Sequence, residues 1–78
     1  MKLTTAIKKL AKHTEVKQND NIYYGELNGH IIDFISRTDE TITCIRVRGI
    51  KDEDDIMTDY WGGVWCDNLT QAIRMAIR

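Results

Sequence analysis

The sequence predicts an α+β fold, in which two helices cover one face of a three-stranded antiparallel sheet. Apolar residues recur with a helical period near both ends of the chain. Between them, two runs rich in β-branched and aromatic residues flank Asn28-Gly29, which is the strongest short signal for a β-hairpin. A chain of 78 residues, 42% of them hydrophobic, has material for one sheet layer and one helix layer. We therefore expect a single domain over residues 1–78.

Residues 3–13 predict an amphipathic helix, because their apolar side chains fall on one face of a 3.6-residue period. Thr4 or Thr5 is expected to cap its start. The following residues, 14–21, break the period and end in a polar, turn-forming cluster. The apolar positions of the helix are Leu3, Ile7, Leu10 and Ala11.

Residues 22–27 and 30–36 predict a hairpin, because a type I′ turn needs positive φ at both central positions and Asn-Gly supplies it. With that turn, Leu27 faces His30 and Tyr23 faces Phe34. One face of the hairpin is then expected to point into the core, through Tyr23, Leu27, Ile32 and Phe34.

Residues 41–48 predict a third strand. If Asp39 and Glu40 are the central pair of the preceding turn, Phe34 faces Ile45, and Ile32 faces Val47, so the apolar row continues across three strands.

The opposite face of this sheet collects charged residues. One row contains Tyr24, Asp33 and Arg46, and the next contains Glu26, Ile31 and Arg48. Opposite charges on adjacent strands stabilise a sheet by a few tenths of a kcal/mol. We expect Arg46 to pair with Asp33, and Arg48 to pair with Glu26.

Residues 67–77 predict the second helix. Asp67 or Asn68 is the expected N-cap, and Asn68 with Gln71 has capping-box spacing. A short fourth strand around Val64 and Trp65 fits before this helix, closing the sheet as scaffold. The apolar stripe, expected on the core face of the sheet, is Leu69, Ala72, Ile73, Ala76 and Ile77.

The formal net charge is −1, but the charges are unevenly distributed. The first seventeen residues are rich in lysine, and residues 52–59 are rich in acids. Cys44 and Cys66 do not form a Cys-x-x-Cys pair, so we expect two reduced thiols, with a bridge only if their segments meet. With no signal-peptide pattern and no apolar stretch approaching about 20 residues, we expect a soluble, cytoplasmic protein.

No pattern in the sequence predicts catalysis or metal binding. His13 and His30 have no serine or cysteine at a motif spacing. The acids at 52–55 are consecutive and do not match a calcium-binding loop. We expect a protein that is not an enzyme and that carries no metal and no cofactor.

The acidic run leads directly into aromatic residues and a Gly62-Gly63 pair. Tyr and Trp dominate protein-binding hot spots, and a rim of carboxylates selects a basic partner. The alternative is a solvated acidic loop that its rings hold against the core. As a docking site for a protein with a basic surface, the residues are Asp52, Asp54, Asp55, Asp59, Tyr60 and Trp61.

A second hypothesis is a small nucleic-acid-binding module, in which basic side chains of the first helix and the third strand contact phosphates. The simpler interpretation is a solvated helix face together with the ion pairs described above. The residues of this hypothesis are Lys8, Lys9, Lys12, Arg46 and Arg48.

Two stretches, residues 54–63 (DDIMTDYWGG) and 67–73 (DNLTQAI), carry a resemblance. They are similar to segments of small phage and mobile-element proteins, and to domains appended to large polyvalent phage proteins. The resemblance covers roughly the last third of the chain. It implies an accessory protein that acts by binding, directed against a host defence system, and it assigns no catalytic residue.

Overall fold

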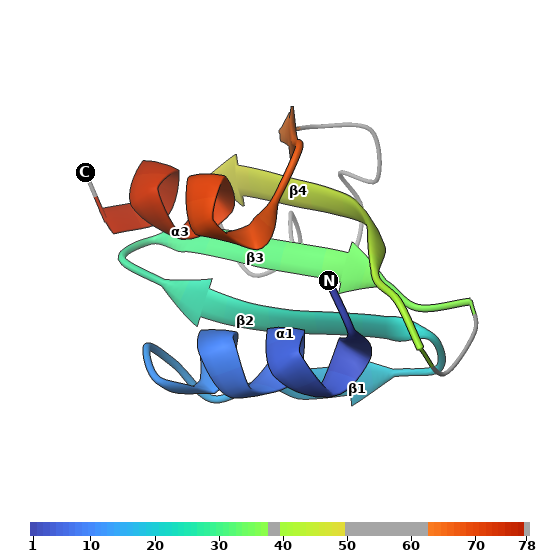
Figure 1. Cartoon of the computed structure of the whole chain (residues 1–78). Coiled ribbons are helices and arrows are strands. Elements are labelled where there is room, and N and C mark those ends of the chain that lie inside the picture. The colour runs from blue at the N-terminus through green and yellow to red at the C-terminus, as the bar shows by residue number, and fades with distance from the viewer. Residues whose placement is uncertain (38–39, 50–62, 78) are drawn as a thin grey trace.

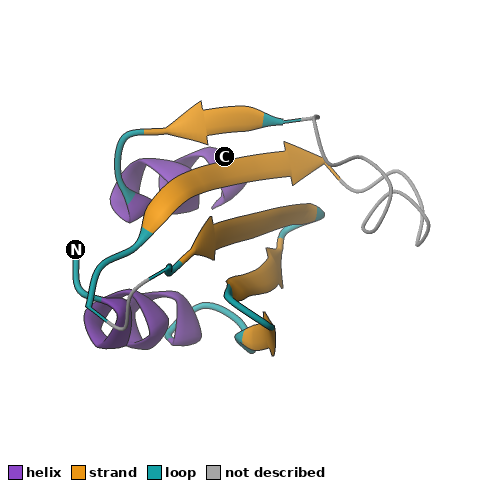
Figure 2. Ribbon diagram, turned by 90° about the vertical axis from the view of Figure 1, so that its right-hand side faces the viewer, coloured by secondary structure: helices purple, strands orange, loops and turns teal. Residues whose placement is uncertain are grey.

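The computed structural model describes residues 1–37, 40–49 and 63–77. These residues form an α+β fold with two helices on one face of a five-stranded antiparallel sheet, ordered β1-β2-β3-β4-β5 (Figures 1 and 2). The fold class is therefore as predicted, with more strands. The elements are α1 (Leu3–Ala11), β1 (Lys17–Asn19), β2 (Ile22–Leu27), β3 (His30–Ile35), β4 (Thr43–Gly49), β5 (Val64–Cys66) and α3 (Leu69–Ile77).

The β2–β3 hairpin confirms the predicted register. Leu27 pairs with His30, and Tyr23 pairs with Phe34. Asn28 and Gly29 both have positive φ, at 52° and 78°, as a type I′ turn requires. The rings of Tyr23 and Phe34 stack with centroids 5.8 Å apart, which places aromatic area at the centre of the core face.

Strand β1 is the element that the sequence did not predict. Its three residues pair with Ile22–Tyr24 of β2 and are all exposed, so no apolar alternation marks them as a strand. The polar cluster that ended the expected loop supplies the turn between β1 and β2, where Asp20 has a φ of 57°.

Strand β4 follows the predicted register only in part. Ile32 pairs with Val47, and Asp33 pairs with Arg46, but the register then shifts so that Ile35 pairs with Thr43. The extra residue is accommodated by a bulge in which Cys44 has a φ of 55°. The strand consequently begins at Thr43, two residues later than expected.

Helix α1 starts differently from the prediction. Its N-cap is Lys2, which makes no side-chain capping bond, so the expected Thr4 or Thr5 cap is wrong. The amide of Leu3 instead donates to the Glu40 carbonyl at 2.9 Å, and the amide of Ile42 donates to the Met1 carbonyl at 3.1 Å. The chain start is thereby attached to the β3–β4 connection.

The inward face of α1 is also shifted from the predicted stripe. Ala6 and Leu10 are fully buried, whereas Ala11, expected inside, is exposed. The helix ends at Ala11 rather than at residue 13.

Helix α3 begins as predicted, with a reciprocal cap. The Gln71 amide donates to Asn68 Oδ1 at 2.8 Å, and the Asp67 amide donates to Gln71 Oε1 at 3.0 Å. The predicted stripe is buried except for Ile77, which is 53% exposed. One core therefore joins both helices to the sheet; its buried members are Ala6, Leu10, Ile32, Phe34, Ile45, Val47, Leu69, Ala72, Ile73 and Ala76.

Within the described part of the chain, neither helix is long and apolar enough to cross a membrane.

Candidate functional site

A row of chemically distinct side chains crosses all five strands on the face opposite the helices. Strand pairing aligns Lys17 with Tyr24, Tyr24 with Asp33, Asp33 with Arg46, and Arg46 with Trp65. Since successive side chains on a strand alternate between faces, this row points away from the core. We call this face, with its five-residue row, the outer sheet face.

Asp33 is the centre of that row. Arg46 donates from Nη2 to Oδ2 at 2.9 Å, and from Nε to Oδ1 at 3.3 Å, in a two-pronged ion pair. Arg48 Nε lies 3.3 Å from the same Oδ2. The predicted Arg46–Asp33 pair is confirmed, whereas Arg48 pairs with Asp33 rather than with the expected Glu26.

These charges are buried: Asp33 is 6% exposed and Arg46 is 7% exposed. Desolvation of buried ions offsets much of their attraction, so the cluster fixes geometry more than it adds stability. Its consequence for function is that both guanidinium groups are already held by one carboxylate.

Trp65 lies at the end of the row, on edge strand β5. It is 58% exposed, and Arg46 Cζ lies 5.8 Å from its ring centroid, which is within reach of a cation–π contact. Val64 beside it is 50% exposed. The sequence interpretation assigned both residues to the scaffold; they do form a strand, but they leave large apolar side chains accessible.

Gly63 allows the chain to enter β5. Its φ is +102°, and a Cβ at this position would lie 2.5 Å from the Val47 carbonyl oxygen. Only glycine combines that φ with so close an approach to β4. Gly63 therefore allows β5, which carries Trp65, to begin close beside β4.

The predicted protein-docking residues, Asp52, Asp54, Asp55, Asp59, Tyr60 and Trp61, lie outside the described residues. The structure describes the strands that precede and follow these residues in the chain. Gly49, at the end of β4, pairs with His30, and Val64, at the start of β5, pairs with Val47. The acidic residues thus fall in sequence between two strands that pair with each other, β4 and β5.

The five residues of the nucleic-acid hypothesis divide between two faces. Lys8 and Lys12 are exposed on the helix side, and Lys9 Nζ donates to Thr70 Oγ1 of α3. Arg46 and Arg48 lie on the outer sheet face, so the sheet separates the two groups (Figure 2).

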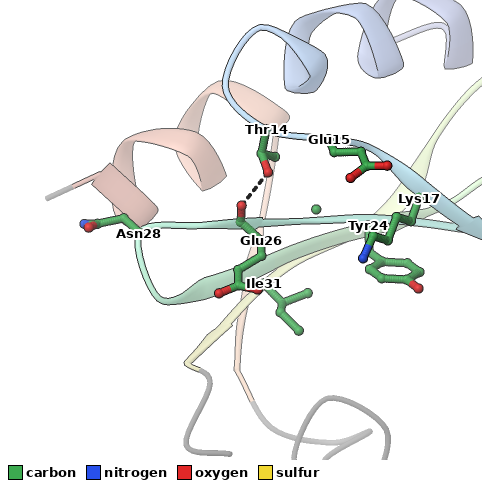
Figure 3. Close-up of a pocket in the computed structure, with 8 residues that line it drawn as sticks. Thr14, Glu15, Lys17, Tyr24, Glu26, Asn28 and Ile31 are labelled. Atoms are coloured by element: carbon green, nitrogen blue, oxygen red, sulfur yellow. Dashed lines mark hydrogen bonds between the residues drawn. The ribbon is translucent and has the colours of Figure 1, made fainter. Parts of the chain in front are cut away.

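A small polar hollow of about 330 Å³ lies beside β2 (Figure 3). Thr14 lines it and donates from Oγ1 to the Glu26 carbonyl at 2.5 Å. Gly25 also lines it, and a Cβ there would lie 2.6 Å from Thr14 Cγ2. Its lining, which contains no cysteine, serine or histidine, is Thr14, Glu15, Lys17, Tyr24, Gly25, Glu26, Asn28 and Ile31.

Both cysteines are free thiols. Burial, and secondarily the charge of Asp67, raises the pKa of the Cys66 thiol. A raised pKa lowers the thiolate fraction at neutral pH, which is the opposite of what a nucleophilic cysteine needs. Cys66 Sγ contacts Met75 Sδ at 3.7 Å, as a packed side chain does. Among the described residues, no group of three or more His, Cys, Asp or Glu side chains is arranged to hold a metal ion.

Two residues with accessible functional groups were missed from the sequence. Trp65 was assigned to the scaffold, as part of a short strand that closes the sheet before the last helix. Arg74 was assigned to neither candidate interface, although its position four residues after Thr70 places both on one side of α3.

Comparison of the chain with protein-family models, with curated proteins and with solved structures found no match. The resemblance of its last third to phage and mobile-element proteins therefore stays a prediction.

Proposed function

We propose that this chain is a small non-enzymatic binding protein that docks on a basic surface of a partner protein. The exposure of Trp65 on an edge strand carries the proposal. The acidic and aromatic residues come shortly before β5 in the chain, so they are close to Trp65 in sequence. The docking residues are then Asp52, Asp54, Asp55, Asp59, Tyr60 and Trp61, extended by Trp65.

The physical roles of the two parts differ. An exposed indole supplies large apolar contact area at a low cost in side-chain entropy, which is why Trp is enriched in hot spots. Carboxylates at the rim steer a basic surface toward it and exclude acidic ones. Arg46 beneath the ring favours one orientation of the indole before the partner arrives. The proposed mechanism is occlusion of the partner's basic surface.

The biological setting that the resemblance implies is a phage or mobile-element accessory factor acting against a host defence system. We include this setting in the proposed function. The alternative of a nucleic-acid module that uses Arg46 and Arg48 has less support, because Asp33 already pairs with both arginines.

The test begins by identifying a host protein that co-purifies with the chain and titrating it, purified, against variants. Trp65→Ala is expected to weaken binding by about 30-fold, the equivalent of roughly 2 kcal/mol for a hot-spot residue. Reversal of two acids, Asp54→Lys with Asp55→Lys, should weaken binding further and reduce its salt dependence. Glu15→Lys is the control, since it reverses an exposed acid away from the site.

A second measurement is needed because Trp65→Ala removes a strand residue. In the wild-type protein labelled with 5-fluorotryptophan, the Trp65 ¹⁹F resonance, assigned with Trp65→Phe, should shift when the partner is added. Wild-type affinity in both the Trp65 and the Asp54/Asp55 variants, or an equal loss in Glu15→Lys, contradicts the proposal.

A further inference from the structure

The two helices form one continuous outward surface. They lie side by side on the same face of the sheet and contact each other (Figure 1). The hydrogen bond from Lys9 Nζ to Thr70 Oγ1 joins the polar side of α1 to the first turn of α3. We call this the helix-layer surface and define it by Lys8, Lys9, Lys12, Thr70 and Arg74.

The residues that define the helix-layer surface include four basic side chains and no acid. Neither helix contains an Asp or a Glu. Lys8, Lys12 and Arg74 are exposed, and no acid among the described residues pairs with any of them. A net charge of −1 for the whole chain thus conceals a strongly positive face.

The helical period concentrates these charges. At 3.6 residues per turn, Lys8, Lys12 and Lys9 fall within an arc of about 100° on α1. Lys8 and Lys12 lie on the side of α1 opposite the buried positions Ala6 and Leu10, whereas Lys9 is half-buried on the side that meets α3. The ammonium groups of Lys8 and Lys12 therefore face solvent together, and Lys9 extends the basic surface toward α3.

An open hollow of about 660 Å³ on α3 adjoins this surface and shares Thr70 and Arg74 with it. Asn68 and Gln71 line it, but their side chains already serve the helix cap. Thr70 and Arg74 also line it, and they bring a hydroxyl and a guanidinium to its wall. Guanidinium and hydroxyl groups are common hydrogen-bond donors to phosphate oxygens.

From this arrangement we infer that the helix-layer surface binds the phosphodiester backbone of duplex nucleic acid, without reading its sequence. Neither helix carries an aromatic residue, so the surface offers no platform on which unpaired bases stack. Arg46 and Arg48 are not part of it, since they lie on the outer sheet face.

An anionic membrane is the competing polyanion, and the packing of α1 argues against it. A helix that binds in a membrane interface inserts its apolar face among the lipids. Ala6 and Leu10 of α1 are instead fully buried in the protein's own core. Trp65, which carries the proposed protein-docking function, lies on the opposite side of the sheet. Loss of nucleic-acid binding and loss of protein binding can therefore be observed independently.

The test measures fluorescence anisotropy of a labelled 20-base-pair DNA duplex over a series of salt concentrations. With about four phosphate contacts, the logarithm of the affinity should fall with the logarithm of salt concentration with a slope of about −3 to −4. Arg74→Glu should weaken binding roughly tenfold and make the slope shallower by about 1. Lys8→Glu with Lys12→Glu should weaken binding more and make the slope shallower by about 2.

Lys17→Glu is the matched control for Arg74→Glu, because it makes the same charge change at an exposed residue of β1. It should leave the affinity within about twofold and the slope unchanged. Circular dichroism of each variant checks that it is folded. Absence of salt-dependent duplex binding, or an equal loss in Lys17→Glu, overturns the inference. Binding to vesicles containing phosphatidylserine but not to the duplex also overturns it.

Discussion

At the scale of single residues, Asp33 is a buried carboxylate with two arginine partners. One carboxylate holds two guanidinium groups on a sheet face where both Asp33 and Arg46 are nearly inaccessible. The sequence indicated the Arg46 contact, because register alone aligns these two strands. It did not indicate that Arg48 also pairs with Asp33. Strand register shows which residues are neighbours, but a long arginine side chain can reach more than one of them.

Replacing Asp33 with Asn tests this cluster. The substitution keeps the shape but removes the charge, leaving two guanidinium groups near each other in a poorly solvated place. We expect a loss of about 3 kcal/mol in the free energy of unfolding, measured by urea denaturation. Glu26→Gln, which neutralises an exposed acid in the adjacent row, should change it by less than about 0.5 kcal/mol. Equal effects of the two substitutions would show that Asp33 is not the central counter-charge.

At the scale of elements, the two helices begin in different ways. Helix α3 carries its own start signal, because Asn68 and Gln71 bond reciprocally to backbone amides. Helix α1 has no side-chain cap and uses the carbonyl of Glu40 from a distant connection. The start of α3 was therefore visible in the sequence, whereas the start of α1 depends on tertiary contact.

Asn68→Ala should consequently destabilise the protein by about 1 kcal/mol, the typical cost of losing an N-cap. Thr5→Ala, at a position the sequence proposed as a cap, should be neutral or slightly stabilising, because alanine favours the helix interior. Thermal unfolding followed by circular dichroism compares the two. A loss in Thr5→Ala as large as that in Asn68→Ala would contradict the assignment of the caps.

At the scale of the whole molecule, one core connects the two helices with the middle of the sheet. Leu10 from α1 and Leu69 from α3 are fully buried in the same cluster as Ile32 and Phe34. Charge is distributed differently: a basic surface lies over the helices, and a carboxylate with two arginines lies on the opposite face. The exposed lysines of α1 and the exposed Trp65 therefore lie on opposite sides of the sheet.

If the core is shared, a cavity in α1 should weaken the whole fold. Leu10→Ala is expected to lower the free energy of unfolding by about 3 kcal/mol. The unfolding transitions followed by far-ultraviolet circular dichroism and by tryptophan fluorescence should still coincide. Ile77→Ala, which truncates a half-exposed helix residue, should cost less than about 1 kcal/mol. Separate transitions in Leu10→Ala would show that α1 and the sheet unfold independently.

The sequence by itself determined the α+β class, the β2–β3 hairpin with its register, the capped start of α3 and the existence of β5. These features depend on local turn chemistry and on periodicity, which neighbouring residues encode. Tertiary structure alone decided the rest: the exposed strand β1, the Cys44 bulge, the start of α1, the turn of Arg48 toward Asp33 and the exposure of Trp65. Each of these depends on partners far away in the chain, and a polar strand or an exposed indole leaves no periodic signal. The separation of the helix lysines from the sheet arginines belongs to the same group, because only packing places the sheet between them.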